Sequence, residues 1–185
     1  MTVRKRRLST PERVNPVSAV HVWKTPSGTG VELLIVTHLE VYKAIDRHST
    51  RSLPHETGGF LLGRVGRDER ADCWHLEIDE AIGIQPAENN PVHFWFSWRD
   101  VDRVRSRREK KGKALIGWYH THPDKGVFLS DTDLEKTHRI LFAEPFQIAL
   151  VYDPVRRRAG YFFWQGPQQI DASPADWREF DINGS

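Results

Sequence analysis

Two histidines and one aspartate in a short stretch have the types and spacing of metal ligands. The stretch GWYHTHPDKGVFLSDTD, residues 117–133, contains His120 and His122 one residue apart and ends at Asp133. Side chains two residues apart on a β-strand point to the same face, so the two imidazoles are expected to project together. Two imidazoles can bind one Zn²⁺ at about 2.0–2.1 Å each, and a carboxylate can supply a third ligand. The fourth position then stays open to water, as it does in catalytic zinc sites.

The same stretch has a purely structural interpretation. Ser130 and Asp133 have the spacing of a helix capping box, in which the serine binds a first-turn amide and the helix dipole favours the acid. Taken alone, Ser-x-x-Asp is usually a cap and His-x-His is usually not a ligand pair. The combination of a strand-end histidine pair, a short turn with Pro123 and Gly126, and an acid at a helix start is what favours a metal centre.

A hydrolytic zinc site also needs a general base near the water. Three acids stand close to the histidines in the sequence: Asp124, Asp131 and Glu135. Asp124 could reach the site from its loop, whereas the other two lie on other faces of the expected helix. The better candidate is Glu56 in HETGGFLLGR, directly before an expected strand. Gly58 and Gly59 follow it and permit a close approach to the backbone. The alternative interpretation of Glu56 is an ordinary acid at the start of a strand.

The hydrophobic pattern places these residues on interleaved strands and helices. Strands are predicted over residues 19–23, 31–36, 58–65, 73–84, 92–96, 114–120, 146–153 and 159–164. Helices are predicted over 37–49, 97–112 and 130–142, with Thr37 and Ser97 as N-caps. The class is therefore α/β or mixed α+β, with a largely antiparallel sheet.

The bulk composition indicates one compact domain. The chain has 185 residues and a formal charge of +2, so no strong overall field directs it to nucleic acid. Basic runs at 4–7, 105–113 and 156–158 fit either solvated surface or a patch for an acidic partner. Because Cys73 is the single cysteine, and no membrane span or signal peptide is evident, a cytoplasmic protein is expected. The predicted boundaries are a basic tail at 1–17, a domain at 18–168 and a C-terminal extension at 169–185.

The combined pattern resembles the JAMM (JAB1/MPN/Mov34) metalloprotease family. An acid in ETGGFLLG is followed by HTHP, six residues, and then SDTD, which fills every position of His-Ser/Thr-His-Pro-x6-Ser-x-x-Asp with an upstream Glu. The likeness runs from about residue 30 to 164. It implies a JAB1/MPN-like, cytidine-deaminase-like fold, with a central, mostly antiparallel sheet flanked by helices.

The resemblance also implies a role for each residue of the pattern. His120, His122 and Asp133 would hold one Zn²⁺, and Glu56 would move a proton from the water to the leaving amine. Ser130 would donate a hydrogen bond to the oxyanion of the scissile carbonyl. Thr121 should point away from the metal. His138, on a different helical face from Asp133, is expected at the surface or in an outer layer, and not as a ligand.

The implied activity is that of an isopeptidase that cuts after the C-terminal glycine of a ubiquitin-like protein. The short chain resembles stand-alone bacterial members of the family, which are typically encoded beside E1-like and E2-like proteins, including in anti-phage defence systems. The same activity could instead cut a ubiquitin-like precursor to expose its glycine. Processing of a sulfur-carrier protein of ubiquitin fold would use the same site. A non-catalytic MPN scaffold, and a nucleic-acid binder that uses the basic runs, are the alternatives from other classes.

Overall fold

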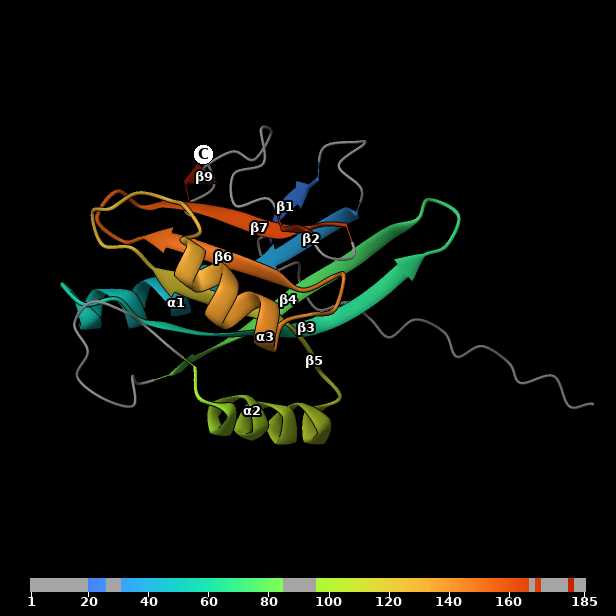
Figure 1. The fold of residues 1–185 in the computed structure, drawn as a ribbon, viewed down its shortest axis with the longest axis horizontal. Coiled ribbons are helices and arrows are strands. Elements are labelled where there is room, and N and C mark those ends of the chain that lie inside the picture. Colours follow the sequence, from blue (N-terminus) through green and yellow to red (C-terminus); the bar gives the residue numbers. More distant parts are fainter. Residues whose placement is uncertain (1–19, 26–30, 85–95, 167–168, 171–179, 182–185) are drawn as a thin grey trace, which may run out of the picture.

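The computed structural model describes residues 20–25, 31–84, 96–166, 169–170 and 180–181. The described strands form one sheet in the order β1-β2-β4-β3-β5-β6-β7-β8, and β9 also pairs with β7 (Figure 1). The strands are β1 (Val20–Lys24), β2 (Glu32–His38), β3 (Gly58–Asp68), β4 (Cys73–Ile84), β5 (Ala114–Thr121), β6 (Ile148–Asp153), β7 (Arg158–Gly166), β8 (Gln169–Ile170) and β9 (Phe180–Asp181).

Most neighbouring strands run antiparallel. The β2–β4 and β5–β6 pairs are parallel, and the remaining described pairs are antiparallel. This confirms the predicted mixed class with a largely antiparallel sheet. β5 lies between β3 and β6, so the strand that carries His120 and leads into His122 is hydrogen-bonded on both sides.

Helices cover both faces of the sheet. The helical segments are α1 (Leu39–Ser52), α2 (Trp98–Lys111), the π-helical segment η1 (Asp133–His138) and α3 (Arg139–Leu141). Tyr42 and Ile45 of α1 share one core cluster with Tyr119, whereas Val101 of α2 shares the other cluster with Trp118. Because Trp118 and Tyr119 are neighbours on β5, the two clusters lie on opposite faces of the sheet. η1 and α3 pack on the same face as α2 (Figure 1).

The predicted strands and helices are present in the described residues, with three differences. Thr37 does not cap α1, because it belongs to β2 and its hydroxyl lies 2.6 Å from the Tyr161 hydroxyl. The predicted helix over 130–142 is π-helical over six of its residues. Residues 1–17 and 92–95 lie outside the described residues, and Phe96, the last residue of the strand predicted over 92–96, is not in a strand.

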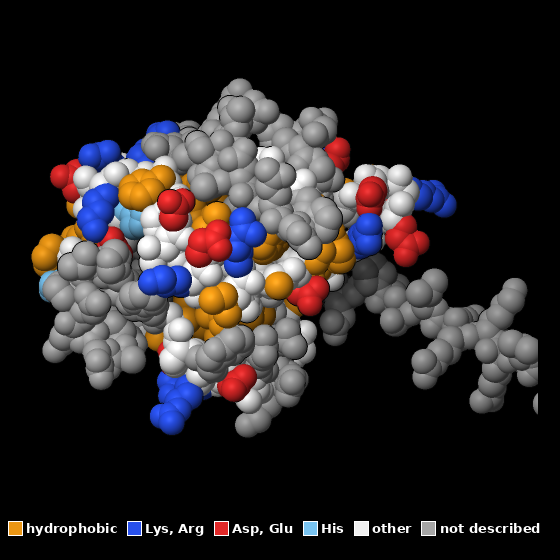
Figure 2. All heavy atoms as spheres, in the orientation of Figure 1, with side chains coloured by type: hydrophobic (Ala, Val, Ile, Leu, Met, Phe, Trp, Pro, Cys, Tyr) orange, Lys and Arg blue, Asp and Glu red, His pale blue; other side chains and the backbone are white. Residues whose placement is uncertain are grey.

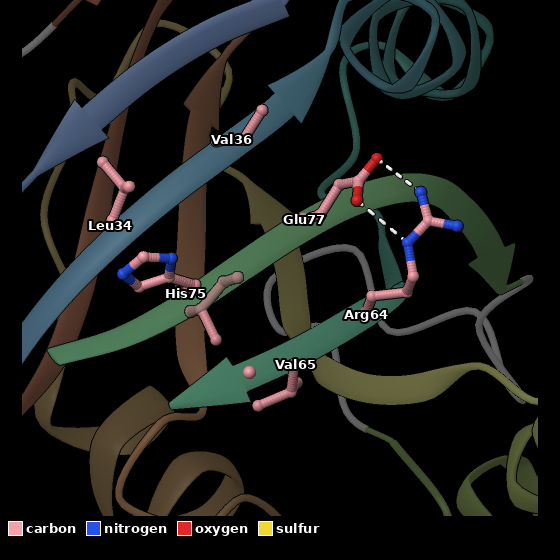
Figure 3. A pocket seen from close by; sticks show the side chains of 8 residues that line it. Leu34, Val36, Arg64, Val65, His75 and Glu77 are labelled. Carbon is pink, nitrogen blue, oxygen red and sulfur yellow. Dashed lines mark hydrogen bonds and ion pairs between the residues drawn. The ribbon is translucent and has the colours of Figure 1, made fainter. Parts of the chain in front are cut away.

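A surface hollow of about 400 Å³ lies over β2, β3 and β4. Figure 3 shows apolar side chains such as Leu34 and Val36 lining it beside the pair formed by Arg64 and Glu77. The Arg64 guanidinium donates two hydrogen bonds to that carboxylate, at 2.9 and 2.7 Å. None of the residues that line this hollow belongs to the predicted metal site.

Candidate metal centre

β5 brings His120 and His122 to one end of the sheet and buries both. His120 is 1% exposed and His122 is 4% exposed. Thr121 points to the other side, where its hydroxyl accepts the Thr57 N–H at 2.9 Å. The His122 N–H donates to the Tyr152 carbonyl of β6 at 2.9 Å, so the backbone stays paired beyond the end of β5. The predicted alternation thus places the two imidazoles on one face of the sheet.

The ligand atoms of three side chains converge at this point. The two Nε2 atoms of His120 and His122 are 3.0 Å apart, and Asp133 Oδ2 lies 3.2 and 3.8 Å from them, respectively. Ligands at zinc distances in a tetrahedral site are separated by about 3.3 Å. Two imidazoles and one carboxylate are also a donor set that zinc accepts. The residues present therefore fit a single zinc ion, with His120, His122 and Asp133 as the group that could hold it.

The protonation states of the site favour metal binding. Burial, together with the neighbouring His120, lowers the pKa of His122 to about 3. Burial raises the pKa of Asp133, but His120 and the hydrogen bonds from Ser130 outweigh this effect and hold that pKa well below its usual range. At neutral pH the imidazole of His122 is therefore neutral and the carboxylate of Asp133 is ionised, which are the forms that bind a metal.

Ser130 forms the predicted capping box with Asp133. The Ser130 N–H and hydroxyl both donate to Asp133 Oδ2, at 3.0 and 2.5 Å, and the Asp133 N–H donates back to the Ser130 hydroxyl at 3.1 Å. Oδ2 is the same oxygen that faces the two imidazoles. The cap therefore orients the carboxylate toward the imidazoles, and the structural and metal interpretations of this pair are compatible.

Glu56 lies beside this cluster, although it precedes it by more than sixty residues in the chain. Gly58 of β3 pairs with His120. The Thr121 N–H donates to the Thr57 carbonyl, and the Thr57 N–H donates to the Thr121 hydroxyl. Glu56 directly precedes Thr57, so this contact brings it close to Thr121, the residue between the two histidines. The side chain of Glu56 is 11% exposed.

Two residues that the sequence analysis did not single out hold the loop after His122. The Lys125 ammonium donates to Glu56 Oε1 at 2.6 Å, and the Lys125 N–H donates to the His122 carbonyl at 3.2 Å. Asp153, which is 0% exposed, accepts the N–H groups of Asp124 and Gly126 at 3.1 and 2.9 Å. The position of Asp153 at the end of a predicted strand, directly before Pro154, was the only sequence signal for this role.

Residues 38–175 match the family model described as prokaryotic homologs of the JAB domain. The chain belongs to this family. The match confirms the resemblance to JAB1/MPN/Mov34 proteins that the motif indicated.

Relatives of this JAB-domain chain include subunits of two large assemblies. It is 27% identical over 143 residues to COP9 signalosome complex subunit 5 of Yarrowia lipolytica, covering 76% of this chain and 38% of the relative. It is 26% identical over 132 residues to 26S proteasome regulatory subunit rpn11 of Schizosaccharomyces pombe, covering 70% and 41%. The chain thus spans about two fifths of the length of these relatives.

A solved structure supports the fold of the JAB-domain chain. The solution structure of a Desulfitobacterium hafniense protein matches with a TM-score of 0.57 and 21% identity, covering 74% of this chain and 88% of that one. At this identity the likeness concerns the fold alone. In the described part of the chain, no helix has the length and apolarity needed to cross a membrane.

Two acids and one histidine near the JAB-domain motif have other partners. The Asp124 carboxylate pairs with Arg156 at 3.2 Å, and Glu135 pairs with Arg139 at 2.9 Å. His138 is fully buried and accepts a hydrogen bond from the Trp118 indole. Of the two positions expected for His138, at the surface or in an outer layer, the first is therefore wrong.

The basic run at 156–158 is paired with acids of the same chain. Arg156 also lies 3.6 Å from Asp153, and Arg157 lies 3.7 Å from Asp46. On the face seen in Figure 2, described side chains of both charges are interspersed. The run at 4–7 and most side chains of 105–113 lie outside the described residues. The described contacts therefore support the interpretation as solvated surface for the run at 156–158 alone.

Proposed function

We propose that this JAB-domain chain is a zinc-dependent peptidase that cleaves after the C-terminal glycine of a ubiquitin-like protein. The convergence of two imidazole nitrogens and one carboxylate oxygen is the observation that carries the proposal. His120, His122 and Asp133 would hold the ion. Membership of the JAB-domain family supports the assignment.

The side chains of the site divide the work of peptide hydrolysis. Zinc, when bound at His120, His122 and Asp133, supplies a polarised water that ionises near neutral pH. Glu56 accepts the proton that the attacking water loses and passes it to the amine that leaves. The Ser130 hydroxyl donates its single proton to Asp133 in the resting site, and would turn to donate it to the oxyanion on the scissile carbonyl, while the Ser130 N–H stays on Asp133.

The proposed substrate is a ubiquitin-like protein joined through its terminal glycine to the lysine of a target. An extended glycine-rich tail can pair with a strand or loop through its backbone, and a glycine fits where that backbone passes the metal. The family model describes prokaryotic homologs, which supports a prokaryotic setting. Within that setting we propose a bacterial conjugation system in the cytoplasm, with E1-like and E2-like proteins as partners and defence against viruses as one context.

Cleavage of a ubiquitin-like protein–lysine conjugate, with and without a zinc chelator, tests the proposal. The chelator and His120→Ala should each abolish cleavage, and His120→Ala should also lose stoichiometric zinc. Glu56→Gln should retain zinc and lose most of the turnover, because the amide cannot accept a proton. Glu40→Gln is the matched control, since Glu40 also pairs with a lysine, Lys43 at 2.7 Å, but lies on α1.

Each failure has a distinct meaning. A Glu56→Gln variant that keeps the full rate would show that Glu56 is not the base. Wild-type protein that binds no zinc would overturn the metal centre. Wild-type protein that binds zinc but cleaves no ubiquitin-like fusion, whatever its C-terminal tail, would favour the scaffold.

A further inference from the structure

The π-helical segment η1 turns His138 back toward the sheet. Its hydrogen bonds span five residues, as in the bond from the Arg139 N–H to the Leu134 carbonyl. Residues five apart in such a turn lie close together on one side, whereas in an α-helix they face different sides. Asp133 and His138, the first and last residues of η1, therefore both reach β5.

His138 holds the indole of Trp118. The Trp118 Nε1–H donates to His138 Nδ1 at 2.9 Å, and both side chains are buried. An indole N–H can only donate, so Nδ1 accepts and the proton of the neutral ring is on Nε2. Burial lowers the pKa of His138 to about 3, so the ring stays neutral and able to accept at physiological pH. Phe142 and Trp164 pack on the same imidazole, with ring centroids at 6.0 and 5.1 Å.

Trp118 in turn lies flat on the ring of His120. The two ring centroids are 4.7 Å apart and the planes differ by 17°. Histidines that bind metals usually donate their second ring N–H to an oxygen acceptor, which fixes the ring. Among the described residues, the Nδ1 atom of His120 is buried and has no hydrogen-bond partner. Because Nδ1 has no such acceptor, the stacked face of the indole is the contact on this side of the ring that can hold its plane.

We propose that His138 is a positioning residue for the metal centre, acting through Trp118 on His120. This inference rests on the proposed function, because it requires that His120 binds the metal. An imidazole that is already held in its binding orientation loses less freedom when the ion binds, so the affinity for the ion rises. His138 and Trp118 would thus do for His120 what an oxygen acceptor does in other metal sites.

Zinc affinity of the full chain, measured by competition with a chromophoric chelator, tests the inference. His138→Phe keeps an aromatic ring but removes the acceptor, and should weaken zinc binding about tenfold. Trp118→Phe should have a similar effect, and the double variant should lose little more than either single variant, because both act through one contact chain. His138→Asn, which retains an acceptor near the position of Nδ1, should recover most of the affinity. The visible spectrum of the cobalt-substituted protein should shift in His138→Phe and return toward wild type in His138→Asn.

Tyr161→Phe is the control for a general loss of stability. It removes a buried hydroxyl that contacts Thr37 and Tyr42 on the opposite face of the sheet, and should leave zinc affinity unchanged. Folded His138→Phe and Trp118→Phe proteins with wild-type zinc affinity would overturn the inference. If His138→Phe does not fold, equal affinities of Trp118→Phe and wild type would do the same. Wild-type protein that binds no zinc would overturn both the metal centre and this inference.

Discussion

At the scale of single residues, one carboxylate serves two structural purposes. Asp133 closes the capping box with Ser130 and also points Oδ2 at the imidazole pair. Sequence spacing could predict both roles, because the box depends on a three-residue offset and the imidazole pair on the two-residue period of a strand. It could not show that one carboxylate fills both roles, since that depends on where η1 packs against β5.

Ser130→Ala tests two roles of the Ser130 hydroxyl, as a helix cap and as a donor to the oxyanion. The variant should lose about 1 kcal/mol of unfolding free energy with the cap, and its turnover should fall by about 10²–10³ if the hydroxyl is an oxyanion donor. Chemical denaturation and steady-state cleavage measure the two effects.

Ser97→Ala is a matched control, because Ser97 and Asp100 form the same box at α2, with corresponding distances of 3.1, 2.6 and 3.2 Å. It should lose similar stability and no turnover. Equal turnover in the two variants would remove Ser130 from the oxyanion site.

At the scale of elements, local pattern predicted most strands and helices but not the π turn. The period of an α-helix places residues 133 and 138 on different faces, and nothing in the local sequence signals the wider turn. The pairing of Lys125 with Glu56 was equally unpredictable, because it joins two loops that only the β3–β5 register brings together. The prediction that Thr37 caps α1 was wrong, because pairing with β1 extends β2 through Thr37.

Gly117 allows β5 and β6 to approach each other below the metal centre. A Cβ added there would lie 2.0 Å from the Ile148 carbonyl oxygen, so Gly117→Ala must displace backbone. We expect it to cost about 3 kcal/mol of unfolding free energy, measured by urea denaturation. Gly66→Ala on β3 is the control, since its added Cβ meets nothing within 4 Å and should be close to neutral. A Gly117→Ala protein as stable as Gly66→Ala would contradict the close packing of these strands.

At the scale of the whole molecule, the fold class, the sheet type and the family were all predictable from the sequence. Alternation fixed which side chains share a face, and the spacing of the motif indicated the family. The domain boundaries, the metal ligands and the roles of Glu56 and Ser130 stay predictions until experiments test them. Long-range contacts such as those of Asp153 and His138 depend on how the elements pack, which local patterns do not contain.

The buried neutral His138 should make the stability of the metal-free protein depend on pH. Its pKa is about 3 in the folded chain, whereas that of an unfolded histidine is about 6.5. Between these values the unfolded state binds one more proton, so unfolding free energy falls as the pH falls, by about 1.4 kcal/mol per unit for this group.

Urea denaturation at several pH values in the presence of chelator measures this slope. Wild type should lose about 2 kcal/mol more than His138→Phe between pH 6.5 and 5. Parallel pH dependences of the two proteins would show that His138 does not remain neutral when folded.

The bonding of β5 to strands on both of its sides has a consequence for how the centre opens. Edge strands can fray one at a time, but an interior strand exchanges its amide protons only when a neighbour separates from it. Deuterium should therefore enter the Trp118 and His120 amides at the rate set by global unfolding, whether or not an ion is present. Removal of the ion should therefore leave the ligand side chains in place, so that a new ion can bind without refolding of the chain.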